Sequence, residues 1–267
     1  MTRAQDDTPE AAGPAVQLLA LGLPRSLGPQ DELPALIVQA ARQQAGGLRA
    51  GDLVVVAQKA VSKTENCFVH VDSVEPGAEA LRLGALLRRD PRLVEIVLRE
   101  SSEVVRCTPH VIITRHRSGV VLANAGVDRS NVPQLGPGEW VVTWPRDPDA
   151  SARRLMQELL LTSGFDIPVI INDSLGRAWR RGTVGQAIGA AGLSCLVDLR
   201  GRTDLYGYRM VSSEVGAADE LAAAASALMG QAGEGTPVVL IRGFAWQADP
   251  QASARDLVRP LPEDLFR

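Results

Sequence analysis

The sequence of 267 residues has few cysteines, few aromatic residues and no long apolar run. Its three cysteines, Cys67, Cys107 and Cys195, are odd in number and far apart, which excludes a disulfide framework and a CxxC metal site and favours a reducing, cytoplasmic environment. No stretch approaches the ~18 apolar residues that a membrane helix needs, and the acidic first residues lack the apolar segment of a signal peptide. We therefore expect no membrane partner.

An excess of basic residues is also missing, because 28 lysines and arginines face 31 aspartates and glutamates, for a net charge of −3. Non-specific nucleic-acid binding usually needs a basic excess, so we expect no nucleic-acid partner. Common catalytic motifs are absent too, among them GxxxxGKS/T, GxGxxG after a strand, HExxH and GxSxG. The three histidines have no metal-ligand spacing, so a metal would rest on oxygen ligands, which favours Mg²⁺ or Mn²⁺.

Lysine is the scarcest basic residue, since only Lys59 and Lys63 occur beside 26 arginines. Both lie in the stretch 58–63, QKAVSK. One interpretation is chance, and the other is that a compact ammonium group is required there and a guanidinium will not serve. We favour the functional interpretation.

Hydrophobic periodicity and turn residues predict a mixed order of strands and helices, and hence a mixed α/β (α+β) fold. Residues 1–14 are expected to be a disordered lead, and the tail 245–267 to be irregular. The segment 173–192 is rich in glycine and arginine and carries no clear element. The expected strands are 16–21, 53–57, 111–114, 120–123, 140–144, 168–172 and 237–242, and the expected helices are 33–45, 79–89, 91–101, 149–163 and 217–229.

Two segments rich in acidic and small residues follow predicted strands. The first, 124–131 (NAGVDRSN), contains Asp128 and Asn131, and the second, 170–183, contains Asp173 beside Ser174. Two carboxylates can hold a divalent cation, and a cation with lysine or arginine can neutralise phosphate. Asp and Asn also favour turns for purely local reasons, so each segment alone is equally well explained as a turn.

The motifs resemble the coenzyme F420-0:L-glutamate ligases, also called γ-glutamyl ligases. They occur in the family's order from about residue 16 to residue 243. The matching stretches are 22–25 with 28–31, 51–65 (GDLVVVAQKAVSKTE), 90–101 (DPRLVEIVLRES), 124–131, 147–155 (DPDASARRL), 171–182 (INDSLGRAWRRG), 187–193 (AIGAAGL), 219–230 (DELAAAASALMG) and 237–243 (PVVLIRG).

The resemblance implies a ligase domain over residues 15–244, with a two-lobed fold peculiar to the family that forms an intertwined homodimer. It implies GTP-dependent addition of L-glutamate to the lactyl carboxylate of coenzyme F420-0, and of further γ-linked glutamates, through an acyl phosphate. Mg²⁺ or Mn²⁺, two ions in all, and K⁺ are the implied cations.

The resemblance also implies roles for single residues. Asp128 and Asp173 match the catalytic, metal-binding aspartates, and Ser174 and Gln231 match further metal positions. Charge matching suggests Arg180 and Arg181 for the anionic precursor. The family's Gln-Thr-Asp is replaced by the stretch 183–186, TVGQ, so the substrate contacts of that stretch stay open. The positions that match nucleotide contacts are Pro24, Arg25, Ser26, Leu27, Lys63, Asn131 and Gln231.

Two other functions are compatible with the same residues. A metal-dependent GTP phosphohydrolase would use both aspartates without needing glutamate or a precursor. A non-catalytic GTP-binding module would bind the nucleotide and turn nothing over. The lysine stretch and the glycine-rich loop 231–235 favour the ligase only through the resemblance.

Overall fold

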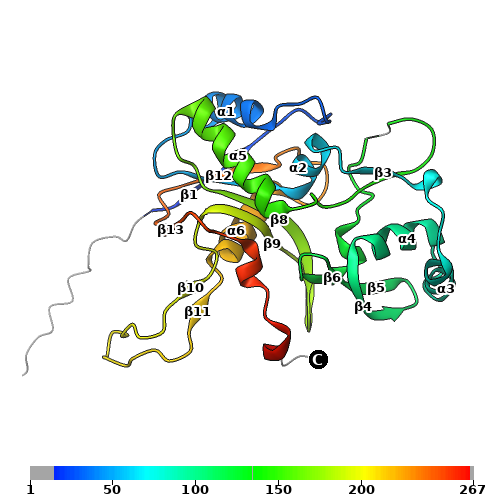
Figure 1. Ribbon diagram of the computed structural model, residues 1–267. Coiled ribbons are helices and arrows are strands. Elements are labelled where there is room, and N and C mark those ends of the chain that lie inside the picture. The colour runs from blue at the N-terminus through cyan, green and yellow to red at the C-terminus, as the bar shows by residue number, and fades with distance from the viewer. Residues whose placement is uncertain (1–14, 134, 265–267) are drawn as a thin grey trace, which may run out of the picture.

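A six-stranded sheet forms the centre of the computed structural model, which describes residues 15–133 and 135–264 (Figure 1). The strand order is β1-β12-β2-β8-β9-β13, and only the β2–β8 pair is parallel. The strands are β1 (Gln17–Leu21), β2 (Leu53–Ala57), β8 (Val169–Arg177), β9 (Arg180–Leu193), β12 (Val238–Arg242) and β13 (Ala248–Asp249).

Helices cover both faces of this sheet. In β2, Val54 and Val56 pack in one apolar cluster with α1 and α5, whereas Leu53 and Val55 pack in a second cluster with α6. Successive side chains of a strand point to opposite faces, so an entirely apolar strand is stable only when both faces are covered. The covering helices are α1 (Leu33–Gln44), α5 (Pro148–Ser163) and α6 (Ala217–Met229).

The middle of the chain forms a second group of elements beside the sheet (Figure 1). It has its own small apolar clusters, a three-stranded sheet in the order β4-β5-β6 and a two-stranded sheet of β3 and β7. Its elements are β3 (Phe68–His70), α3 (Ala78–Leu87), α4 (Pro91–Arg99), β4 (Ser101–Thr108), β5 (Val111–His116), β6 (Val121–Ala123) and β7 (Trp140–Val142).

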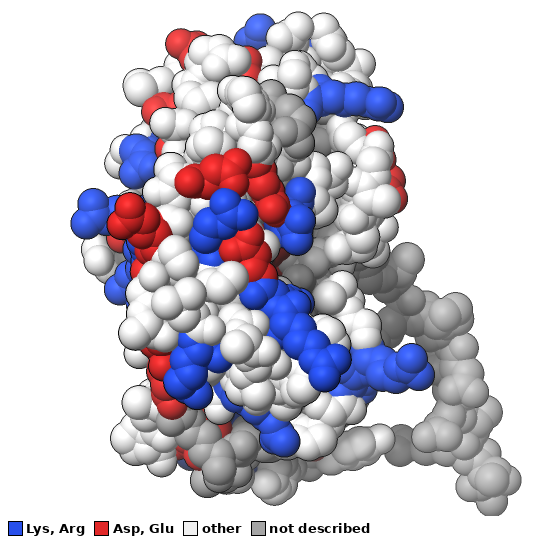
Figure 2. Space-filling model, turned by 90° about the vertical axis from the view of Figure 1, so that its right-hand side faces the viewer, with Lys and Arg blue, Asp and Glu red and all other residues white. Residues whose placement is uncertain are grey.

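Acidic and basic side chains lie next to one another on the side of the molecule where α3 and α4 are found (Figure 2). Two of the pairs are local, because Arg82 contacts Glu79 and Arg99 contacts Glu95 within one helical turn. Exposed pairs of this kind contribute little to stability.

Most predicted elements are confirmed to within a few residues. Asp90 caps α4 through a hydrogen bond from the Arg92 backbone N–H, and Gly164 ends α5 in the left-handed conformation. Helix α5 begins at Pro148, one residue before its predicted start at Asp149, and Asp147 is its N-cap. The Asp149 carboxylate instead accepts hydrogen bonds from the backbone N–H groups of Ala190 and Ala254 and from the Ser253 hydroxyl.

Several elements were not predicted, among them the short strands β3, β10 (Val197–Asp198), β11 (Glu214–Val215) and β13. Three more matter for the site or its surroundings. They are α2 (Gln58–Thr64), the strand β4 and the long β8–β9 hairpin over the segment 173–192. The tail is mostly irregular, yet β13 pairs with β9, and Ala254 packs in the apolar cluster under α6. The expected lead 1–14 lies outside the described residues, and no described helix has the length and hydropathy to cross a membrane.

Glycines in β9 explain why that strand escaped prediction. Glycine is unfavourable in strands by propensity, but here it lets helices approach the sheet closely. A Cβ added to Gly185 would lie 2.4 Å from the Ala222 carbonyl oxygen of α6, and one added to Gly189 would lie 2.5 Å from the Pro148 carbonyl oxygen at the start of α5. These contacts set the positions of both helices.

We predict that Gly189→Ala lowers the free energy of unfolding by ~1–3 kcal/mol, because the added methyl group overlaps the backbone of Pro148. Urea unfolding of purified protein measures the change. Gly176→Ala in β8 is the matched control, since nothing lies within 4 Å of the added methyl group. Equal stability of the two variants would contradict the packing argument.

Candidate functional site

A cavity of about 410 Å³ opens where β2 ends, beside the middle of β8. Because these strands are parallel, with Ala57 opposite Asn172, the residues that follow β2 begin beside Asp173 and Ser174, and β8 runs on past the cavity to Arg177. The volume lies within the range of small-molecule sites. The lining side chains come from five segments: Leu23, Pro24, Arg25 and Leu27; 57–60 with Lys63; 131–133; 172–174; and Ser226 with 229–237.

Helix α2 carries both lysines into this cavity. Lys59 and Lys63 are four residues apart, so they share one face of the helix, and both line the cavity. The buried Gln58 side chain fixes the start of the helix by donating to the Ser62 hydroxyl (2.6 Å) and to the Thr143 carbonyl oxygen (3.2 Å). Burial, and to a smaller extent the charge of Lys59, lowers the pKa of Lys63.

Asp128 lies against the first of these lysines. The Lys59 ammonium is 2.6 Å from Asp128 Oδ2 and 2.8 Å from the Ser130 hydroxyl, while the Ser130 backbone N–H donates to Asp128 Oδ1. Burial raises the pKa of Asp128, but the hydrogen bonds from Lys59 and Ser130 outweigh burial, so its pKa lies below the ordinary value. Asp128 therefore stays ionised.

Asp173 is held by two hydrogen bonds from its own surroundings. Its Oδ2 accepts from the Trp144 indole N–H at 2.8 Å, and its Oδ1 accepts from the Ser174 backbone N–H at 2.8 Å. Burial raises the pKa of Asp173, the nearby Asp128 adds to the rise, and Lys59 opposes it. Since Lys59 and Asp128 both act on this carboxyl group, the two acidic segments converge on one site within a single chain.

The glycine-rich loop after α6 closes another side of the cavity. The Asn131 amide donates to the Ala232 carbonyl oxygen (2.8 Å), and the Gln231 amide donates to the Ser226 hydroxyl (3.2 Å). Gly230 has a φ of +72°, so the chain leaves the helix in a conformation that L side chains rarely adopt. The loop lines the same cavity as the two lysines.

Some predicted residues do not line this cavity. Ser26 is exposed beside it, and Asp128 reaches it through Lys59. Arg180 and Arg181 lie exposed at the turn of the β8–β9 hairpin. The stretch 183–186, interpreted from the sequence as a loop, belongs to strand β9, with Gln186 opposite Asp173.

Sequence reasoning missed two residues of the site. Lys59 was singled out by its rarity, but no role was derived for it, although its spacing from Lys63 would have placed both on one helical face. Trp144 carried no local signal, because its contact with Asp173 joins residues 29 positions apart.

The donor chemistry fits a hard divalent cation. Asp128, Asp173 and the Ser174 hydroxyl offer oxygen atoms, as Mg²⁺ and Mn²⁺ prefer, and Gln231 offers an amide oxygen. Among the described residues no group of three or more His, Cys, Asp or Glu side chains could hold a metal. A cation here would thus take part of its oxygen shell from ligand or water.

Comparison with known proteins identifies the family. The model of the F420-0:gamma-glutamyl ligase family matches residues 24–243. The chain belongs to this family. The matched range includes every residue that lines the cavity except Leu23.

Proteins described as coenzyme F420:L-glutamate ligases match this chain along most of their length. A coenzyme F420:L-glutamate ligase of Methanopyrus kandleri is 42% identical over 257 residues, covering 95% of this chain and 98% of the relative. Proteins of the same description from Methanothermobacter thermautotrophicus and Methanocaldococcus jannaschii are 41% and 39% identical, over 90% and 94% of this chain and 94% and 97% of each relative.

We predict that anion binding in the cavity weakens at high pH through Lys63. Because its pKa is lowered, Lys63 loses its charge at a lower pH than an ordinary lysine, and an anion then loses a charged partner. Calorimetry with inorganic tripolyphosphate should show the affinity of the wild type falling relative to Lys63→Arg as the pH rises from about 8 to about 10. Parallel profiles for the two proteins would contradict this assignment.

Proposed function

We propose that this protein is a GTP-dependent ligase that joins L-glutamate to the lactyl carboxylate of coenzyme F420-0. The observation that carries the proposal is the meeting of two lysines, Asp173 and a glycine-rich loop at one cavity, with Asp128 paired to Lys59, in a chain of this ligase family. Relatives described as coenzyme F420:L-glutamate ligases cover nearly the whole chain.

The charges of the cavity suit a polyanionic nucleotide. Lys59 and Lys63 would contact phosphate oxygens as compact point charges. Asp128, Asp173, Ser174 and Gln231 would hold Mg²⁺ or Mn²⁺, two ions in all. When bound, these cations would neutralise charge between phosphate and carboxylate.

The coupling needs activation, because an amide does not form spontaneously from a carboxylate and an amine in water. A carboxylate oxygen of the precursor attacks the γ-phosphorus of GTP, the bond to the β-phosphate oxygen breaks, and GDP leaves. The amine of glutamate then attacks the acyl carbon, the C–O bond to phosphate breaks, and the amine proton is released as phosphate departs. Addition of further γ-linked glutamates would repeat both steps. The proposal also includes K⁺ as an additional bound cation.

We predict that the protein with GTP, Mn²⁺, glutamate and coenzyme F420-0 yields a product heavier by one glutamyl unit per step, as measured by mass spectrometry. Asp128→Asn and Asp173→Asn should each lower turnover at least ~100-fold, because each removes a charge from the site.

Two results would contradict the ligase. Loss of GTP at the same rate without glutamate or precursor would indicate a phosphohydrolase. Tight GTP binding without any turnover, and with no effect of the two asparagine variants on it, would indicate a binding module. Omission of each substrate in turn is the control.

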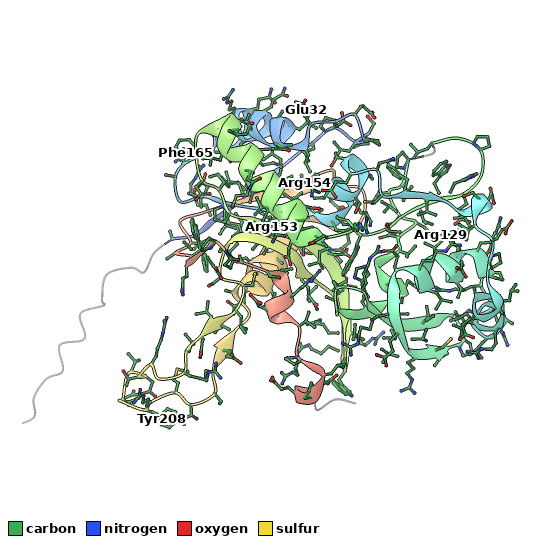
Figure 3. The ribbon with its side chains drawn as sticks, viewed as in Figure 1. Glu32, Arg129, Arg153, Arg154, Phe165 and Tyr208 are labelled. Carbon is green, nitrogen blue, oxygen red and sulfur yellow. The ribbon has the colours of Figure 1, made fainter. Side chains whose placement is uncertain are left out.

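We further propose that the chain forms a homodimer through the 197–215 arm, which consists of β10 (Val197–Asp198), β11 (Glu214–Val215) and the loop between them. Leu205 and Tyr206 near its tip are 97% and 96% exposed, and Tyr208 lies at the outer end of the arm in Figure 3. Such large exposed apolar side chains mark interaction surfaces. A second copy of the chain is the partner that the family resemblance implies.

We predict that the double variant Leu205→Asp, Tyr206→Ser shifts the protein from dimer to monomer in light scattering after size exclusion. The exposed Leu161 on α5 provides the control, and Leu161→Asp should leave the mass unchanged. A wild-type monomer, or a double variant that stays dimeric, would contradict the role of the arm.

A further inference from the structure

The strip of residues 142–144, at and just beyond the end of β7, connects the two acidic segments of the site. Asp128 and Val142 exchange both backbone hydrogen bonds, each 2.9 Å long. Two positions further on, the Trp144 indole N–H donates to Asp173. Residues two apart in extended chain are separated by ~6.6 Å, so this strip fixes how far apart the two aspartates are held.

The indole of Trp144 has little freedom of orientation. The side chain is 1% exposed and is among the largest fully buried side chains of the chain. A Cβ on Gly126 would lie 2.3 Å from Trp144 Nε1, so the absence of a side chain at Gly126 allows the indole edge to fit. The imidazole of His116 packs against the indole, with the two ring centroids 4.6 Å apart and the ring planes tilted by 52°. The direction of the N–H bond is therefore set by packing.

This N–H group orients the Asp173 carboxylate without neutralising it. Each carboxylate oxygen can accept about two hydrogen bonds or ligand contacts, and Oδ2 and Oδ1 each use one, on Trp144 and on the Ser174 backbone. The remaining capacity is available to a cation. Loss of such an orienting hydrogen bond typically lowers metal affinity 10–100-fold.

We propose that Trp144 is a positioning residue, which fixes the orientation of Asp173 and its distance from Asp128 for binding a divalent cation. The inference rests on the proposed function in one respect, that Asp173 is a cation ligand. It adds a residue that binds neither cation nor substrate and acts through its indole N–H.

Mn²⁺ titration tests this role without turnover. Calorimetry should show that Trp144→Phe binds Mn²⁺ ~10–100-fold more weakly than the wild type, at a temperature where both proteins are folded. Quenching of tryptophan fluorescence by paramagnetic Mn²⁺ should be strong in the wild type and largely lost in the variant. Trp246→Phe is the matched control, since its indole donates to the Gly51 carbonyl oxygen (3.3 Å) outside the cavity, and it should bind Mn²⁺ like the wild type.

A second replacement separates the hydrogen bond from packing. Incorporation of 3-benzothienylalanine at position 144 keeps the ring shape but puts sulfur where the N–H was, and it should show the same loss of Mn²⁺ affinity. Wild-type Mn²⁺ affinity in the 3-benzothienylalanine protein, or in Trp144→Phe, would overturn the positioning role of Trp144 and leave the proposed function standing. A wild type that binds no Mn²⁺ would overturn the cation site of the proposed function and this inference together.

Discussion

The parallel pairing of β2 with β8 is the constraint on which the site depends. This pairing places α2, which follows β2 and carries both lysines, beside Asp173 and Ser174 of β8. In an antiparallel pair, by contrast, the carboxyl ends of the two strands lie at opposite edges of the sheet. The burial of β2 on both faces makes that pairing rigid, because neither strand can shift without opening two apolar clusters.

The charges gathered there balance one another closely. Lys59 forms an ion pair with Asp128 and lowers the pKa of Asp173, while Lys63 is buried and forms no ion pair with a carboxylate in the part of the chain that the structure describes. Bringing two carboxylates together is unfavourable unless cations lie between them, and burying an ammonium is unfavourable unless an anion meets it. The site thus has complementary needs that a phosphate-bearing ligand and a divalent cation would meet together.

The sequence was a good guide to whatever depends on local pattern. The all-apolar β2, the Asp90 cap and the alanine-rich α6 follow from periodicity and end signals, and they are confirmed. Strand β9 could not be predicted from local pattern, because its glycines are required by helices that pack on it and come from distant parts of the chain. The same reason applies to Trp144, whose role depends on Gly126 and Asp173. The gathering of Asp128, Asp173 and Lys63 was expected from the resemblance, and no spacing rule could have supplied it.

The anchoring of the tail by Asp149 bears on where the folded unit ends. The family match stops at residue 243, yet the buried Asp149 carboxylate takes two of its three hydrogen bonds from Ser253 and Ala254. Each such bond to a charged acceptor contributes ~1.5–3 kcal/mol. A fragment that ends at residue 243 would leave this carboxylate of α5 without two of its hydrogen-bond donors. We expect the lost stability to affect β9 as well, because the Ala190 N–H of that strand donates to the same carboxylate. The stable unit therefore extends past residue 243 at least to the 3-10 helix Ala254–Leu257.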